Sequence, residues 1–219
     1  MMNDICNPNK AYNELVKPTD GPISRYFNRR ISIRITCFLI NHNIKPQPNT
    51  ITLLTTLIGL LTAITTYLNP LIGGFLVEIT SILDGIDGEI ARLTGKVSRY
   101  GAFLDAMLDR IVDISILTTG SLYLLDILEP KSALIIASWL ISSSILVSYL
   151  HARGEASLNT NLQLLGFRIY AGRDVRLFLY SIALILYVFQ PLIYLSLTII
   201  IALLSTIYIF CKIIVARKL

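Results

Sequence analysis

Long apolar runs separated by short polar connectors dominate the chain after residue 50. Several of these runs approach the ~20 residues that a membrane-spanning helix needs. The connectors at Asn69-Pro70 and Gln190-Pro191 are typical of tight turns, because these residues interrupt regular helices. The pattern therefore predicts an all-α integral membrane protein whose six spans form one bundle. The predicted spans are Ile51–Tyr67, Leu71–Leu93, Gly101–Leu125, Ala133–His151, Val175–Phe189 and Leu192–Val215.

A shorter helical pattern precedes the first span. Apolar residues recur at helical spacing from Ile23 to Leu39, and polar residues that include Arg29, Ser32 and Thr36 share the other face. This pattern predicts an amphipathic helix that lies in the membrane interface. We expect an N-terminal segment over residues 1–48 that contains this helix, followed by the six-helix domain over residues 49–219.

Composition supports the prediction of a membrane protein, and the distribution of its Lys and Arg residues predicts its orientation. Hydrophobic residues make up 54% of the 219 residues and charged residues 15%, with a mean hydropathy of +0.66, whereas about 25% of a soluble domain is charged. Of the 19 Lys and Arg residues, only Lys131 falls on the opposite side of the predicted bundle from the others. This bias places both termini in the cytoplasm of a multi-pass cell-membrane protein, and it explains the net charge of +5 without nucleic acid.

Carboxylates gather in the second and third spans, where each costs about 2.5–3.5 kcal/mol to insert. Asp84 and Asp87 share one helix face, and Asp105 and Asp109 lie one turn apart on the next helix. Because the link between the two spans is short, we expect these faces to converge at the cytoplasmic side. Four carboxylates balance two divalent cations, and oxygen ligands favour Mg²⁺, Mn²⁺ or Ca²⁺ over zinc. The sequence predicts a site for two cations, Mg²⁺ first and Mn²⁺ as the alternative.

The cysteines, the histidines and the remaining carboxylates of these spans do not predict a further site. The three cysteines are widely spaced and the two histidines are isolated, which indicates neither a disulfide framework nor a zinc site. Glu78, Glu89 and Asp113 receive no role.

Small residues accompany the acidic faces. Gly88, Ala91 and Gly101 leave room for a ligand between the helices, although small residues also serve close helix packing. Arg92 supplies a planar fork of donors that suits phosphate. The combination predicts a substrate that carries a pyrophosphate. It disfavours the alternative of a cation channel or transporter lined by aspartates, because Arg92 would impede the passage of cations.

The spacing of these residues resembles the signature of the CDP-alcohol phosphotransferase family, D-x2-D-G-x2-A-R-x8-G-x3-D-x3-D. Every fixed position is present between Asp84 and Asp109, and Pro48–Thr52 resembles the family's P-N-x-(I/V)-T element. The six-span layout is also that of the family, whose members are usually homodimers. The resemblance implies transfer of a substituted phosphate group from a CDP-alcohol to the hydroxyl of an acceptor alcohol, with release of CMP.

The resemblance also implies a role for each matching residue. Asp84 and Asp105 would bridge both metals, Asp87 would bind the first metal and Asp109 the second. Asp109 would also be the general base. Ser98 stands where many members carry Thr. The residues implied to surround the CDP portion of the donor are Asn49, Thr52, Gly88, Ala91, Arg92, Ser98 and Gly101.

The identity of the substrates is less constrained. Residues Lys17–Arg25 and Arg173–Phe178 resemble archaeal di-myo-inositol-phosphate-phosphate synthases, which implies CDP-inositol as donor and inositol 1-phosphate as acceptor. A phosphorylated acceptor needs basic ligands, and we expect these to be Arg153, Arg173 and Arg176, although membrane topology and lipid headgroups also account for such arginines. The alternatives are a CDP-lipid donor, as in phosphatidyl- or archaetidylinositol-phosphate synthases, and glycerol phosphate as acceptor.

Overall fold

The computed structural model describes residues 6–44, 46–166 and 171–217, and every regular element within these ranges is helical. The chain begins with α1 (Pro8–Leu15), a π-helical turn (Ser24–Asn28) and α2 (Arg29–Asn41). Short 3₁₀ helices occupy Leu122–Asp126 and Leu162–Leu164. The bundle consists of α3 (Pro48–Leu68), α4 (Pro70–Leu83), α5 (Gly85–Leu93), α6 (Arg99–Ser121), α7 (Pro130–Leu158), α8 (Arg173–Tyr187) and α9 (Pro191–Ala216).

The starts of the long helices follow the local sequence. α3, α4, α7 and α9 each begin with a proline, which is favoured there because the first turn leaves its N–H groups unpaired and proline has none. Asn69 ends α3 and caps α4, since its Oδ1 accepts the backbone N–H of Ile72 at 3.0 Å. These signals place the helix boundaries close to the predicted ones.

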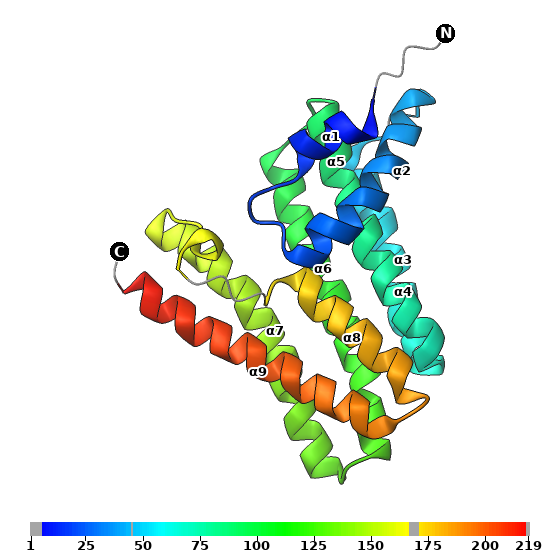
Figure 1. Cartoon of the computed structure of the whole chain (residues 1–219), viewed down its shortest axis with the longest axis vertical. Helices are drawn as coiled ribbons and strands as arrows, with labels where there is room; N and C mark the ends of the chain where they lie inside the picture. Colours follow the sequence, from blue (N-terminus) through cyan, green and yellow to red (C-terminus); the bar gives the residue numbers. More distant parts are fainter. Residues whose placement is uncertain (1–5, 45, 167–170, 218–219) are drawn as a thin grey trace.

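The bundle has two distinct ends (Figure 1). The connectors that follow α3, α6 and α8 lie at one end, whereas α1, the α5–α6 link and the end of α9 lie at the other. Within the ranges that the structure describes, three helices, α3, α7 and α9, are long and apolar enough to cross a membrane. Their outer faces expose large apolar side chains such as Leu57, Leu134 and Phe210. These are the features of a multi-pass membrane protein.

The predicted second span, Leu71–Leu93, is two helices rather than one. α4 ends at Leu83 and α5 begins at Gly85, so that Asp84 occupies the junction. A Cβ atom at Gly85 would lie 2.5 Å from Nη1 of Arg29. The junction is therefore a point where α2 approaches the bundle closely, and hydropathy alone does not reveal it.

α4 is held between α3 and α8 by close backbone contact. A Cβ atom at Gly73 would lie 2.5 Å from the Cα of Thr66 in α3, and one at Gly74 would lie 2.8 Å from the carbonyl oxygen of Ser181 in α8. Small residues allow such approach between membrane helices, where dispersion contacts supply much of the stability. These contacts hold the first turns of α4 between α3 and α8, at the opposite end of the helix from Asp84.

α2 turns its polar face inward. A helix does form over Arg29–Asn41, within the predicted amphipathic stretch. Ser32 and Thr36 are buried against the bundle, however, while Tyr26 and Phe38 are exposed. The polar residues thus serve an internal contact, and the placement of this helix in the membrane interface stays a prediction, as does the domain division at residue 48.

A disulfide joins Cys6 to Cys37, contrary to the expectation of no disulfide. The side chain of Asn41 supports the pairing, because its Oδ1 accepts the backbone N–H of Cys6 at 2.8 Å and its Nδ2 donates to the Cys6 carbonyl at 3.0 Å. The spacing of the cysteines along the sequence does not reveal this disulfide, because the disulfide depends on α1 folding back onto α2.

Candidate active site

Three carboxylates converge where α6 passes the junction of α4 and α5. Asp84, Asp105 and Asp109 each offer an oxygen, and these atoms all lie within 4.8 Å of one another. Asp105 and Asp109 are one turn apart on α6, and α3 packs against both α4 and α6. Hard oxygen donors at such separations suit a divalent cation such as Mg²⁺ or Mn²⁺. The structure thus brings together three of the four predicted metal ligands.

Asp87, the fourth predicted ligand, lies beside this trio with its carboxylate already hydrogen-bonded. It accepts from the hydroxyl of Thr52 at 2.5 Å and from the backbone N–H of Gly88 at 2.5 Å. Only 6% of the residue is exposed. Asp87 therefore connects α5 to the start of α3, and its role as a metal ligand stays a prediction.

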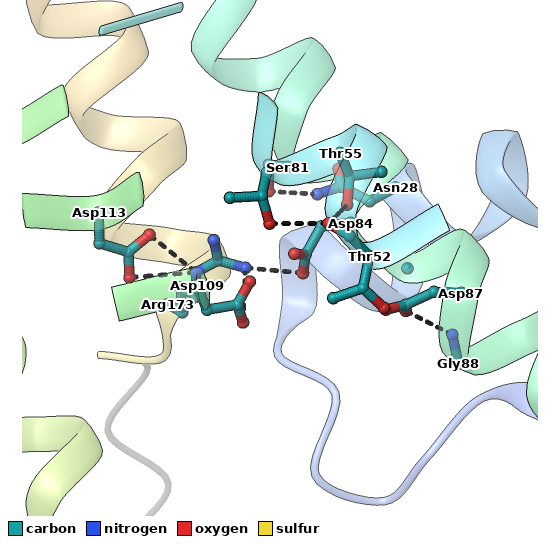
Figure 2. A network of polar contacts seen from close by, with 12 residues as sticks. Asn28, Thr52, Thr55, Ser81, Asp84, Asp87, Gly88, Asp109, Asp113 and Arg173 are labelled. Carbon is teal, nitrogen blue, oxygen red and sulfur yellow. Dashed lines mark hydrogen bonds and ion pairs between the residues drawn. The ribbon is translucent and has the colours of Figure 1, made fainter. Parts of the chain in front are cut away.

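The guanidinium group of Arg173 lies beside the carboxylates of Asp84, Asp109 and Asp113 (Figure 2). Nη1 of Arg173 lies 2.6 Å from Oδ2 of Asp84 and 3.2 Å from Oδ2 of Asp109. Its Nε donates to Asp113 at 2.9 Å, so Asp113, for which the sequence predicted no role, orients this arginine. In this arrangement Arg173 contacts carboxylates, whereas we had expected it to face an acceptor phosphate.

A cavity of about 580 Å³ opens beside the trio and is lined by all three carboxylates and by basic residues. Arg176 is buried, and its Nη1 donates to the carbonyl of Ala171 at 2.6 Å. Arg110 donates to the hydroxyl of Ser148 and lies 3.4 Å from the carboxylate of Asp109. The cavity combines carboxylates with cationic side chains, which suits a polar ligand that carries an anionic group.

The basic lining differs from the predicted one. Arg153 is exposed on α7 and is absent from the lining of this cavity within the described ranges. The acceptor role expected for Arg153 therefore stays a prediction, which the lining of this cavity by its neighbours His151 and Ala152 does not support. Arg110 was missed, although its place directly after Asp109 was a usable signal.

A second cavity, of about 340 Å³, lies on the other side of Asp105. Among the described residues that line the two cavities, Asp105 alone is common to both. The second cavity is lined by all the predicted donor-binding residues, namely Asn49, Thr52, Gly88, Ala91, Arg92, Ser98 and Gly101.

The surroundings of Arg92 and Gly88 in this second cavity suit an anionic ligand. Nε and Nη2 of Arg92 are buried and have no hydrogen-bond partner in the part of the chain that the structure describes. A Cβ atom at Gly88 would meet only Nη1 of Arg92, at 3.5 Å. Unpaired guanidinium N–H groups beside open backbone suit a phosphate group that approaches the helix closely.

Glu89 explains why the polar face of α2 turns inward. The residue is fully buried, and its carboxylate accepts from Nη1 of Arg29 at 2.8 Å, from Ser32 at 2.6 Å and from Thr36 at 2.7 Å. Nε of Arg29 in turn donates to Asp20 at 3.2 Å. Although burial opposes it, the carboxylates of Asp20 and Glu89 raise the pKa of Arg29. The network joins the N-terminal segment to the helix that carries Gly88.

Comparison with known proteins agrees with this geometry. The family model of CDP-alcohol phosphatidyltransferases matches residues 46–209. The bifunctional IPC transferase and DIPP synthase of Archaeoglobus fulgidus is 37% identical over 167 residues, which cover 74% of this chain and 32% of the relative. The archaetidylinositol phosphate synthase of Aeropyrum pernix is 34% identical over 133 residues, 60% of this chain and 63% of that protein. The chain thus spans about a third of the length of the bifunctional relative.

Solved structures share the fold. The phosphatidylinositol phosphate synthase of Mycobacterium tuberculosis, solved with CDP-DAG bound, superimposes with a TM-score of 0.71 at 25% identity, over 85% of this chain and 94% of that chain. The same enzyme solved with manganese and citrate gives a TM-score of 0.71 at 24% identity, over 85% of this chain and 88% of that one. The similarity extends over most of the helical bundle.

Proposed function

Because the chain belongs to the CDP-alcohol phosphatidyltransferase family, we propose that it transfers phosphoinositol from CDP-inositol to inositol 1-phosphate and releases CMP. Members of this family transfer a substituted phosphate group from a CDP-alcohol donor to an alcohol acceptor. Membership therefore excludes the alternative of a cation channel or transporter. One observation carries the proposal: two cavities meet at Asp105. In one, two nitrogens of Arg92 have no hydrogen-bond partner among the described residues, and the other is lined by both carboxylates and arginines.

The smaller cavity receives the CDP portion of the donor. The free Nε and Nη2 of Arg92 bind phosphate oxygens, while the open surface at Gly88 and Gly101 lets the nucleotide approach the helices. Ser98 and Asn49 offer polar contacts at the same cavity. This placement leaves the phosphorus under attack beside Asp105, at the boundary with the larger cavity.

The larger cavity receives the acceptor. Arg110 and Arg176 line it and bind the phosphate of inositol 1-phosphate, because charge-assisted hydrogen bonds from guanidinium groups favour phosphate. This phosphate orients the acceptor so that a ring hydroxyl faces the acidic trio. Among the described residues no carboxylate forms an ion pair with Arg176, whereas Arg110 already pairs with Asp109 and Asp113. A neutral alcohol leaves Arg176 without an anionic partner, and we therefore favour a phosphorylated acceptor.

Asp84, Asp105 and Asp109, with Asp87 beside them, would hold two divalent cations, of which Mg²⁺ fits the oxygen donors best and Mn²⁺ is the alternative. When bound, these cations neutralise the diphosphate and polarise the phosphorus. Asp109 accepts the proton of the acceptor hydroxyl as that oxygen bonds to the β-phosphorus. The bond from this phosphorus to the bridging oxygen breaks, and CMP leaves with the electron pair.

The proposal includes a topology. α3, α4 with α5, α6, α7, α8 and α9 form six crossings, of which three meet the criteria of length and hydropathy. α6 carries charged site residues, and the 15 residues of α8 span only about 22 Å. The excess of Lys and Arg at the end that holds the site supports the proposal that both termini and the site are cytoplasmic. Membrane lipids surround the bundle, and a homodimer is the expected assembly.

A CDP-lipid donor is the second candidate. Tyr100 and Phe103 on α6, near the donor cavity, are exposed and apolar, and they offer a surface along which acyl or isoprenoid chains could lie in the bilayer. The similarity to inositol phosphate synthases with lipid names supports this alternative. Glycerol phosphate as acceptor is a third possibility.

The test is a CMP-release assay on detergent-purified protein, with and without Mg²⁺. CDP-inositol and a CDP-lipid are each paired with inositol 1-phosphate, inositol and glycerol 3-phosphate. We expect the fastest Mg²⁺-dependent release with CDP-inositol and inositol 1-phosphate. Faster release with the CDP-lipid replaces the proposed donor by the second candidate, and equal rates with inositol and its phosphate contradict the proposed acceptor site.

A further inference from the structure

A short segment that lies outside the family signature closes the N-terminal side of both cavities. It comprises residues 17–24 and is named here the strap; it lies within the dark blue loop between α1 and α2 (Figure 1). Thr19, Asp20 and Gly21 line the larger cavity. Lys17, at the other end of the strap, lines the smaller cavity. The strap therefore reaches from one substrate cavity to the other.

The backbone at Lys17 is fixed by local hydrogen bonds. Its N–H donates to the carboxylate of Asp20 at 2.9 Å, and its carbonyl accepts from the N–H of Asp20 at 3.0 Å and from Nη2 of Arg25 at 3.1 Å. These bonds form a closed turn. The position of Lys17 is thus set by the fold, although its side chain is exposed to solvent.

The strap is also tied to the bundle at three points. Arg29 joins Asp20 to the buried network of α5. The backbone N–H of Ser24 donates to Asp174 at the start of α8, at 2.9 Å, and the side chain of Gln163 donates to the carbonyl of Thr19 at 2.5 Å. Contacts with α5, α8 and the α7–α8 connection hold the strap over the cavities.

The electrostatics at Lys17 indicate an anionic ligand. In the described part of the chain, no carboxylate pairs with its ammonium group, whereas Arg29 and Arg173 each have such partners. Partial burial, together with the positive charges of Arg92 and Arg29, lowers the pKa of Lys17, against the opposing effects of Asp20 and Asp105. Three cationic residues, Lys17, Arg92 and Lys96, line the smaller cavity, and an anion bound between them would be stabilised by their charges.

We propose that Lys17 is a donor-binding residue whose ammonium group binds the diphosphate of the CDP-alcohol across the cavity from Arg92. The inference rests on the proposed function, because it takes the smaller cavity as the donor site. It adds to that function a ligand from the N-terminal segment, so that donor binding depends on the strap being in place.

Direct binding of CDP to the purified protein tests the proposal. Because the side chain is exposed, Lys17→Gln should fold normally, with an unchanged melting temperature. We expect it to weaken CDP binding, and to raise the KM for the CDP-alcohol, by about tenfold, while kcat and the KM for the acceptor stay within about threefold. Lys17→Arg should retain most of the affinity, since it keeps the charge. Lys10→Gln, on exposed α1 and away from both cavities, is the matched control.

The outcomes separate the inference from the function on which it rests. If the wild-type protein binds CDP and Lys17→Gln binds it within about twofold as tightly, Lys17 is a solvated surface lysine and the inference is wrong. If Lys10→Gln weakens binding as much as Lys17→Gln does, the effect is one of overall charge, and the inference is also wrong. A wild-type protein that binds no CDP and releases no CMP refutes both the proposed function and the inference.

Discussion

Nη1 of Arg173 lies 2.6 Å from Oδ2 of Asp84, inside the cluster of carboxylates proposed to hold metal. The same nitrogen is 3.2 Å from Asp109, so one guanidinium group neutralises part of the negative charge that a divalent cation would neutralise. Arg173 is thus an internal counter-ion of the acidic trio. A cation that enters the trio competes with it for the same oxygens.

Removal of this counter-ion should increase metal affinity. Arg173→Gln is expected to bind Mn²⁺ about tenfold more tightly, or ~1.4 kcal/mol, because the ion no longer displaces a guanidinium group. Titration followed by the electron paramagnetic resonance of free Mn²⁺ measures this affinity. Arg34→Gln, on the exposed side of α2, is the control. Weaker Mn²⁺ binding by the Arg173 variant would show that the arginine assists the metal site instead.

Asp105 should be indispensable for metal binding. Its oxygen lies within 4.8 Å of those of Asp84 and Asp109, and replacing it by Ala removes a hard oxygen ligand and one negative charge. We expect loss of Mn²⁺ binding and of CMP release together. Retention of full Mn²⁺ affinity in Asp105→Ala would place the metal elsewhere.

Asp109 should be needed for the chemical step more than for donor binding. Asp109→Asn keeps the shape of the side chain but removes the proton acceptor, so turnover should fall by about 10²–10⁴-fold. CDP binding should change little, because the residue lines only the larger cavity. A variant that turns over at the wild-type rate would exclude Asp109 as the base.

Two glycine substitutions should distinguish a glycine that leaves room for a ligand from one that allows close helix packing. Gly88→Ala places a methyl group 3.5 Å from the nearest side chain, and it should weaken CDP binding without lowering the melting temperature. Gly73→Ala places a methyl group 2.5 Å from the Cα of Thr66, and it should destabilise the protein by about 1–3 kcal/mol, as overpacking does. Thermal unfolding in detergent and CDP titration distinguish the two. An equal loss of stability in both variants would mean that Gly88 serves packing.

Glu89 should stabilise the N-terminal segment. Glu89→Gln leaves the buried network with a neutral partner for Arg29, and we expect a loss of about 1–3 kcal/mol in the free energy of unfolding. Limited proteolysis should cut the strap faster in this variant. Glu155→Gln, exposed near the end of α7, is a control. Unchanged stability and proteolysis would show that the network contributes little.

The helices of the bundle were predictable because their signals are local. Apolar runs, together with Pro70 and Pro191 at helix starts, define most boundaries from neighbouring residues alone. The extension of α7 to Leu158 was missed because its last turns are polar. The break at Asp84 was missed because it depends on the approach of Arg29 from a distant part of the chain.

In the candidate site, too, features encoded by neighbouring residues were predictable and contacts between distant residues were not. The residues proposed to bind the donor could be predicted as a group because one contiguous signature and the start of α3 contain them, and they line one cavity; their role stays a prediction. The partners of Arg173 and Glu89 were not predictable, since these contacts join residues more than 50 positions apart. The position of Arg153 outside the lining of the larger cavity was not predictable, because charge bias locates an arginine on a side of the membrane and not on a face of its helix.

The sharing of Asp105 by two otherwise separate cavities has a kinetic consequence. If the smaller cavity binds the donor and the larger one the acceptor, as proposed, the two substrates occupy different cavities and do not compete for the same space. An inhibitor that fills only the arginine-lined side should leave nucleotide affinity intact and act as non-competitive towards the donor. In a compound that joins cytidine to an inositol mimic, the linker would have to pass directly beside Asp105.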